Sequence, residues 1–384
     1  MKETKLPLLI GIGSRIRKSP YFDSTIKYGA TGFTIYNRMY LPTAFSGPER
    51  EYNSLINDVT FGDFAAERQV EVSGPDAYNF IRYINPRNLS KCDIGDCKYI
   101  VLTDKNGGII NDACLIRLEP NKFWVSPGDG DVLLWLQGIA INSGMDVDIH
   151  EPDVSPLQIS GPKAGKLIQK LFNGIHDDLG YYKARETSLN DIPMVIARTG
   201  WSGELSYELY LQDRKKGDEL FEIVHEAAKE FNGAVIAPNI IRTIEGGLLS
   251  YQSDFGREHN PFTIGLERLV DLDQDIDFIG KEALKKIKAE GISEKLVGVE
   301  IDGDPIHKAP ENFWPVFDVN HKKIGRLSRC FFSPRLKKNI GLAIININFV
   351  EPGTPLILES PKAHLNAQVH ELPWFPAEKS TNLD

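Results

Sequence analysis

Ala66-Glu-Arg-Gln-Val-Glu-Val-Ser-Gly-Pro-Asp76 is the stretch that decides the fold, because it joins a strand pattern to a turn and a helix start. Its first residues alternate in polarity, and Asp76 stands near the N-cap of a helical pattern that runs to Ile84. The same order returns in Pro156-Leu-Gln-Ile-Ser-Gly-Pro-Lys-Ala-Gly-Lys-Leu-Ile168. Strand, Ser-Gly-Pro and helix, occurring twice, predict two related βα units in a duplicated α+β layer.

Segments around these units add a hairpin, two helices and a β-rich end. Asp104-Lys-Asn-Gly-Gly108 has the composition of a hairpin turn and lies between two strand patterns, so a β-hairpin is predicted here. Residues 220–231 and 239–251 predict amphipathic helices, the second capped by Asn239. After residue 288 the chain turns to short strands between turns, which predicts a small C-terminal β-barrel or sandwich.

Composition limits the function. The chain has 384 residues, which favours two or three domains, and a net charge of −9, which argues against nucleic acid as a partner. No window approaches eighteen consecutive apolar residues, so no membrane span is predicted. The apolar run in the first residues is too short for a signal peptide, so we expect the protein to be located in the cytoplasm. A small or zwitterionic ligand fits this composition.

Common cofactor motifs are missing from the sequence. It contains no Walker loop, no Gly-x-Gly-x-x-Gly after a strand and no His-Glu-x-x-His. No histidine is spaced to complete a zinc site with the cysteines, so no metal is predicted. The four cysteines are expected to be reduced core thiols: Cys92, Cys97, Cys114 and Cys330.

Arg198-Thr-Gly-Trp-Ser-Gly-Glu-Leu-Ser-Tyr-Glu-Leu-Tyr210 is the strongest candidate for a ligand site. Gly200 allows close approach of a ligand to the backbone, Trp201 offers a flat face and Glu204 offers an acceptor. A planar, amide-bearing heterocycle would use both side chains. The alternative from these residues alone is a hairpin turn with a packed Trp201 and a solvated Glu204.

Several motifs, in order over nearly the whole chain, resemble the glycine-cleavage T-protein (aminomethyltransferase) family. They are residues 107–112, Gly-Gly-Ile-Ile-Asn-Asp, the 198–210 stretch, residues 244–251, Ile-Glu-Gly-Gly-Leu-Leu-Ser-Tyr, and residues 332–334, Phe-Ser-Pro. Residues 36–43 and 67–78 are most similar to its tetrahydrofolate-dependent dimethylsulfoniopropionate demethylase branch. The resemblance implies a three-domain, ring-like α+β fold with tetrahydrofolate in its central opening.

The same resemblance implies domain boundaries. We expect a folate-binding α+β domain over residues 1–50 and 152–275, with a second α+β domain inserted at 51–151. A β-barrel or jelly-roll-like domain is expected at 276–375, and a flexible tail at 376–384.

Site residues are carried over by position. Glu204 matches the glutamate that holds the pterin edge, and Asn111 falls where aminomethyltransferases place an essential aspartate. Arg242 lies one residue before the position of the family arginine. The expected catalytic residues are Asn111 and Tyr207, and the expected cofactor contacts are Glu204, Trp201, Gly200 and Arg242. The expected contacts to the methyl donor are Tyr36, Tyr40, Arg38 and His259, with Arg68 and Arg329 as further candidates for its carboxylate.

The resulting hypothesis is transfer of a methyl group from a small sulfonium zwitterion, with dimethylsulfoniopropionate as the leading candidate, to N5 of tetrahydrofolate. A first alternative keeps folate and takes an aryl methyl ether, betaine or dimethylglycine as donor. An ether leaves as a phenolate and would make a proton donor such as His259 or Tyr207 essential. A second alternative is a folate-binding protein without catalysis.

Overall fold

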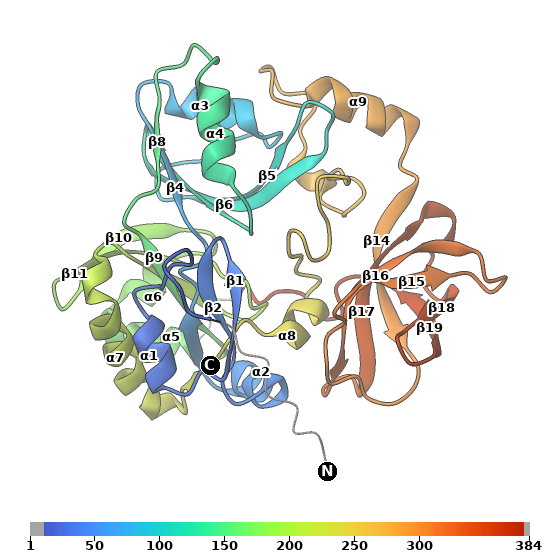
Figure 1. Cartoon of the computed structure of the whole chain (residues 1–384). Helices are drawn as coiled ribbons and strands as arrows, with labels where there is room; N and C mark the ends of the chain where they lie inside the picture. The colour runs from blue at the N-terminus through green and yellow to red at the C-terminus, as the bar shows by residue number, and fades with distance from the viewer. Residues whose placement is uncertain (1–10, 380–384) are drawn as a thin grey trace.

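The computed structural model describes residues 11–379 and shows three parts around a central region (Figure 1). The first part contains a six-stranded sheet of order β10-β11-β12-β9-β3-β13 and a two-stranded ribbon, β1-β2. Its strands are β1 (Gly32–Tyr36), β2 (Met39–Ala44), β3 (Thr60–Asp63), β9 (Ser155–Ser160), β10 (Ala184–Leu189), β11 (Ile192–Ala197), β12 (Ser206–Leu211) and β13 (Ala234–Val235). Its helices are α1 (Phe22–Lys27), α2 (Pro48–Asn57), α5 (Ala164–Leu171), α6 (Ile175–Asp178), α7 (Gly217–Ala228) and α8 (Ile240–Glu245).

The second part is built on a five-stranded sheet of order β5-β6-β7-β4-β8. Its strands are β4 (Val70–Ser73), β5 (Cys97–Thr103), β6 (Ile109–Glu119), β7 (Lys122–Pro127) and β8 (Asp148–His150), and its helices are α3 (Ala77–Ile84) and α4 (Val132–Ala140). Strand pairing assigns β3 to the first part, since β3 pairs with β9. The expected boundary at residue 51 would have placed β3 in the inserted domain.

Each sheet buries one face under helices and turns the other toward its neighbour. Apolar residues of α5 and α7 pack on β9 and β12, while α3 and α4 cover the five-stranded sheet. On the opposite faces, Trp124 of β7 and Tyr210 of β12 belong to one buried cluster. The two sheets therefore pack against each other through the strands that also carry the polar side chains described below.

The two Ser-Gly-Pro turns confirm the predicted repeat. Gly74 and Gly161 have nearly the same φ, 117° and 119°. A Cβ on Gly74 would lie 2.8 Å from the carbonyl oxygen of Asp146, and one on Gly161 would lie 2.5 Å from that of Asp58. Only glycine fits such a turn, because a side chain would meet both the wrong φ and a backbone carbonyl.

The third part is a closed barrel, as expected, of order β14-β17-β16-β15-β18-β19. Its strands are β14 (Glu294–Ile301), β15 (Trp314–Phe317), β16 (Lys323–Ser333), β17 (Lys338–Asn346), β18 (Pro355–Glu359) and β19 (His364–His370), and α9 (Lys281–Glu290) precedes it. Short 3₁₀ turns lie at Arg214–Lys216, Lys229–Phe231, Glu267–Leu269 and Ile347–Phe349. The barrel packs on α8, whose Ile241 and Ile244 share a core with Leu342 and Ile344.

Two predicted elements differ from the structure. The helix from Asn239 is capped as expected, since its side chain accepts from the Arg242 N–H at 3.1 Å, but it ends at Glu245. Gly246 and Gly247 follow, and the φ of +60° at Gly247 turns the chain out of the helix. The expected flexible tail is wrong for residues 376–379, which contact the folded chain. Residues 380–384 lie outside the described part, as do residues 1–10.

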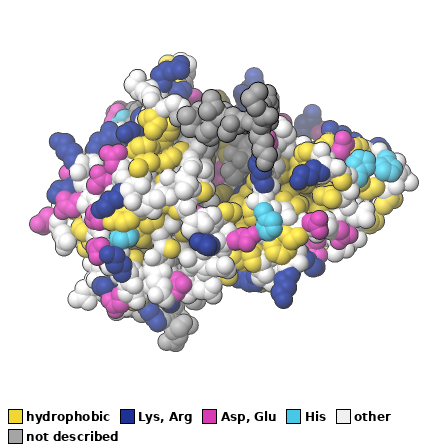
Figure 2. Space-filling view, turned by 60° about the horizontal axis from the view of Figure 1, so that its bottom comes forward, with side chains coloured by type: hydrophobic (Ala, Val, Ile, Leu, Met, Phe, Trp, Pro, Cys, Tyr) yellow, Lys and Arg dark blue, Asp and Glu magenta, His cyan; other side chains and the backbone are white. Residues whose placement is uncertain are grey.

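On the face in Figure 2, basic and acidic side chains lie scattered among one another. Such mixing gives no continuous basic surface on this face for a phosphate backbone. Within residues 11–379, no helix has the length and the apolar character needed to cross a membrane.

Candidate active site

A cavity of about 1000 Å³ lies where the three parts meet. Its volume is at the upper end of the range for small-molecule sites, and residues of both sheets, the linker after α8, the barrel and the C-terminal segment line it. The lining residues used below are Tyr36, Glu67, Tyr99, Asp112, Ser126, Gly128, Thr199, Gly200, Trp201, Glu208, Arg268, Lys295 and Lys379.

Glu208 is the deepest acid of this cavity, at 3% exposed. It lies on β12, where Tyr207 and Leu209 point to the helix-covered core and Glu208 points to the opposite face. The Tyr210 hydroxyl donates to its Oε2 at 2.9 Å, and the Thr199 hydroxyl donates to the same oxygen. Both of these hydrogen bonds go to Oε2, which leaves Oε1 as the acceptor that a ligand in the cavity can use.

The turn before β12 shapes the wall beside Glu208. Gly200 has a φ of +152°, and a Cβ there would lie 2.5 Å from Ser206 Cβ, so glycine is required. Trp201 is held by its ring N–H to the Leu249 carbonyl, at 3.0 Å, and by its backbone N–H to Gln158, at 2.9 Å. The turn therefore presents a fixed indole to the cavity.

Asp112, not Asn111, is the side chain of β6 that lines the cavity. The Tyr99 hydroxyl donates to its Oδ2 at 2.7 Å, and burial raises its pKa to about 6. Asn111 is fully buried and donates to the Asp129 carbonyl at 3.0 Å. Asp112 therefore lines the cavity and Asn111 lies beside it, behind Gly128. The catalytic role expected of Asn111 stays a prediction.

Three of the ten predicted site residues line the cavity, namely Tyr36, Gly200 and Trp201. Seven do not: Arg38, Tyr40, Asn111, Glu204, Tyr207, Arg242 and His259. Tyr207 is fully buried in the core under α5 and α7, where its hydroxyl contacts His176. His259 is buried behind the hairpin of residues 104–108, in a separate hollow, and accepts from the Gly256 N–H at 3.1 Å.

The remaining predicted donor contacts are engaged elsewhere. Tyr40 packs on Phe22, and its hydroxyl accepts from the Gly13 N–H at 3.0 Å. Arg38 pairs with Asp131 on the surface, at 3.2 Å, and Arg68 pairs with Glu151. Arg329 forms a buried ion pair with Asp254.

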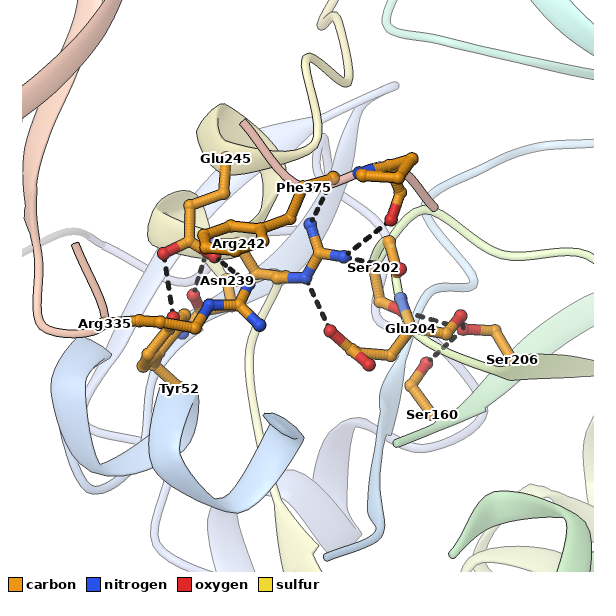
Figure 3. Close-up of polar contacts among 12 residues, drawn as sticks. Tyr52, Ser160, Ser202, Glu204, Ser206, Asn239, Arg242, Glu245, Arg335 and Phe375 are labelled. Atoms are coloured by element: carbon orange, nitrogen blue, oxygen red, sulfur yellow. Dashed lines mark hydrogen bonds and ion pairs between the residues drawn. The ribbon is translucent and has the colours of Figure 1, made fainter. Parts of the chain in front are cut away.

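Glu204 and Arg242 form an ion pair that holds the C-terminal segment (Figure 3). Arg242 Nε lies 2.6 Å from Glu204 Oε1, and its terminal nitrogens donate to the carbonyls of Gly203, Phe375 and Pro376 at 2.8, 3.4 and 3.3 Å. Gly203 permits this approach, because a Cβ there would lie 2.7 Å from the guanidinium. The carboxylate of Glu204 therefore binds an arginine, and Glu204 does not line the cavity.

A second ion pair supports the same segment. Arg335 lies 2.6 Å from Glu245, and its guanidinium stacks 3.5 Å from the Phe375 ring centroid. The segment continues through a hydrogen bond from the Glu378 N–H to the Gly203 carbonyl, at 3.0 Å, and reaches the cavity at Lys379. The two pairs thus fix the chain end as a wall of the cavity.

We expect Arg242→Ala to release this wall, because the substitution removes four contacts and leaves the partly buried Glu204 unpaired. Trypsin cleavage after Lys379, followed by mass spectrometry, should become about tenfold faster or more, as local opening becomes easier. Arg185→Ala, which removes an exposed pair with Asp178 at 3.8 Å, is the matched control. Equal cleavage rates in both variants would show that Arg242 does not hold the segment.

Sequence reasoning missed Glu208, Asp112 and Glu67. The usable signal was the strand alternation: in β12, Tyr207 and Glu208 cannot face the same side, and Tyr207 continues the apolar series of Leu209 and Leu211. Among the described residues, one group of possible metal ligands lies close together, Glu222, His225 and Glu226 on α7, and none of the three lines the cavity.

Comparisons with known proteins agree with this architecture. Residues 21–274 match the model of the GCVT N-terminal domain, and residues 294–376 match the glycine cleavage T-protein C-terminal barrel domain. A dimethylsulfoniopropionate demethylase, DmdA, of Ruegeria pomeroyi is 32% identical over 94% of this chain and 98% of its own length. An aminomethyltransferase of Bacillus cytotoxicus is 28% identical over 95% of this chain and 99% of its own.

The fold has a solved counterpart. The glycine cleavage system aminomethyltransferase T of Bartonella henselae superposes with a TM-score of 0.84 at 20% identity, covering 95% of this chain and 99% of the other. Both family models together span most of the described chain, and the demethylase relative covers nearly its whole length. The chain therefore belongs to the glycine-cleavage T-protein (aminomethyltransferase) family, whose members use tetrahydrofolate.

Proposed function

We propose that this protein is a tetrahydrofolate-dependent methyltransferase that takes a methyl group from a small sulfonium zwitterion, with dimethylsulfoniopropionate as the first candidate. The observation that carries the proposal is the cavity wall of Glu67, Asp112 and Glu208 beside tyrosine and tryptophan rings. The demethylase relative, similar over nearly the full length of both chains, supports the choice of donor.

The residues of the cavity fit folate. Glu208 offers its Oε1 as an acceptor for the N–H groups of an aminopyrimidinone edge, the role first expected of Glu204. Arg268, Lys295 and Lys379 line the same cavity and can receive the carboxylates of a glutamyl tail. A cavity lined by both buried carboxylates and cations suits a ligand that carries both N–H donors and carboxylates.

When bound, tetrahydrofolate supplies a nucleophilic N5 that accepts the methyl group. The carbon–sulfur bond breaks as the carbon–nitrogen bond forms, and the sulfur keeps the electron pair and leaves as a neutral sulfide. Asp112, whose pKa is raised to about 6 by burial, would offer the carboxylate that accepts the proton displaced from the folate nitrogen on methylation. The aromatic walls and Glu208 hold donor and acceptor in line and exclude water.

The ether alternative has less support in this cavity. Its two expected proton donors, His259 and Tyr207, lie outside the cavity, in a separate hollow and in the core. A phenolate leaving group would also meet the three carboxylates of the wall, which disfavour negative charge. Betaine and dimethylglycine remain alternative donors to the same folate site.

The test is a donor panel with tetrahydrofolate under anaerobic conditions. We expect 5-methyltetrahydrofolate, detected by mass, from dimethylsulfoniopropionate and not from methoxyaryl compounds. Product from betaine or dimethylglycine alone would contradict the choice of donor and leave folate-dependent transfer intact. Tight binding of folate with no product from any donor would favour the non-catalytic alternative.

A further inference from the structure

Three carboxylates from three separate elements meet in the cavity. Glu67 lies in the loop before β4, Asp112 on β6 and Glu208 on β12. Within residues 11–379, none of the three forms an ion pair with a lysine, arginine or histidine. Arg68, the next residue after Glu67, is turned away and pairs with Glu151. No cation of the described protein therefore balances the ionised form of any of the three, and a ligand can do so.

Glu67 is the least stabilised of the three. Asp112 accepts a hydrogen bond from Tyr99 at 2.7 Å, and Glu208 accepts from Tyr210 and Thr199. Glu67 accepts from the Ser126 hydroxyl at 3.3 Å, a long hydrogen bond. Burial, followed by the charges of Glu208 and Asp112, raises the pKa of Glu67 well above its usual range. A cation beside Glu67 would offset both the burial of its carboxylate and the repulsion from Glu208 and Asp112.

The surroundings of Glu67 are those of a cation site. Tyr36 and Trp201 line the same cavity as Glu67, and burial, followed by the charges of Glu67 and Asp112, raises the pKa of Tyr36. Aromatic faces attract onium heads, and a carboxylate adds direct charge complementarity. An onium head has no N–H or O–H to donate, so it binds through charge and ring faces alone.

We propose that Glu67, together with Tyr36, recognises the positive head of the methyl donor and sets the specificity of the site for onium compounds. Glu208 keeps the folate contact, so the two glutamates divide the recognition of donor and acceptor. A neutral donor of the same shape would leave Glu67 desolvated without a partner, and the site would reject it on that ground. This inference rests on the proposed function, because it names the donor side of the same cavity.

The test compares two non-reactive ligands that differ in the charge of the head. They are 3-(trimethylammonio)propionate and 4,4-dimethylpentanoate, which share the carboxylate and the branched head. We expect the wild type to bind the cationic ligand at least about tenfold more tightly, by calorimetry with and without tetrahydrofolate. Glu67→Gln should reduce this preference to about twofold or less by weakening the cationic ligand alone, with the dissociation constant of tetrahydrofolate unchanged.

A second measurement separates charge recognition from a structural role. A cation favours the ionised form of Glu67, so its binding should release a proton, visible as a dependence of the calorimetric heat on the ionisation enthalpy of the buffer. The release should be lost in Glu67→Gln and kept in Glu119→Gln, a variant of an exposed glutamate at the end of β6. Retained release in Glu67→Gln would assign the proton to Asp112 or Glu208 and overturn the proposal.

Two further outcomes would overturn it. One is equal affinity of the wild type for the two ligands, and the other is a loss of tetrahydrofolate affinity in Glu67→Gln as large as the loss for the cation. Failure of the proposed function looks different, since the wild type would then not bind tetrahydrofolate while its choice between charged and neutral ligands could still be measured.

Discussion

Glu208→Gln should lower the affinity for tetrahydrofolate by about 100-fold, because it removes the charge from hydrogen bonds that a buried carboxylate would make to the pterin. Glu208 is 3% exposed, and its Oε2 is already occupied by Tyr210 and Thr199, so the ligand meets a buried acceptor that is held in place. A glutamine in this place can accept with one atom and must present an amide N–H with the other. Fluorescence or calorimetric titration with tetrahydrofolate gives the dissociation constants.

Glu204→Gln is the matched control, since it makes the same change four residues earlier in the chain. Glu204 pairs with Arg242 and does not line the cavity, so this variant should keep tetrahydrofolate affinity within about threefold while loosening the C-terminal segment. The reverse result, with affinity lost in Glu204→Gln and kept in Glu208→Gln, would restore the assignment made from the sequence motif alone. Circular dichroism of both variants shows whether the fold is retained.

The two glutamates illustrate how far the sequence could lead. The motif from Arg198 to Tyr210 correctly marked a ligand-facing turn, since Gly200 and Trp201 line the cavity. It could not say which glutamate does so, because that depends on where the turn ends and β12 begins. The strand starts at Ser206, after which the side chains alternate strictly, and Glu208 falls on the cavity face. On β6, likewise, Asp112 lines the cavity and its neighbour Asn111 does not.

Contacts between residues far apart in the chain could not be predicted from the sequence, for a related reason. The repeated Ser-Gly-Pro turns and the barrel follow from local patterns, and the structure has both. The hydrogen bonds from Arg242 to Phe375 and Pro376 depend on the path of the C-terminal segment, which leaves the barrel and passes beside Arg242 (Figure 3). A polar chain end is predicted to be a flexible tail when the residues that bind it lie more than a hundred positions away in the sequence.

A buried ion pair joins the barrel to the rest of the protein. Arg329 of β16 donates to both carboxylate oxygens of Asp254, at 2.8 and 2.6 Å, and Asp254 is fully buried in the linker after α8. Ser328 and the Ser250 N–H complete the carboxylate, at 2.7 and 2.8 Å. Every acceptor position of Asp254 is thus used, and the charge is compensated inside the interface between the two parts.

Asp254→Ala should lower the free energy of unfolding by about 3 to 5 kcal/mol, because it leaves the Arg329 guanidinium buried without its counter-ion. Urea denaturation measures this loss. Replacing both partners, as Asp254→Leu with Arg329→Met, should recover most of it, since no charge then remains in the interface. Arg326→Ala, on the same strand as Arg329, is the control. Its ion pair with Glu258 is partly exposed and should contribute less than about 1 kcal/mol.

The same ion pair should also affect ligand affinity. The Arg329 guanidinium lies 5.8 Å from the ring centroid of Trp201 and donates to the Leu248 carbonyl at 2.7 Å, and both Trp201 and Leu248 line the cavity. Asp254→Ala should therefore weaken tetrahydrofolate binding as well as stability, while the double variant restores stability without restoring the position of Trp201. If the double variant recovered both, the contribution of Arg329 would be to the interface alone and the indole would be held by its bonds to Leu249 and Gln158.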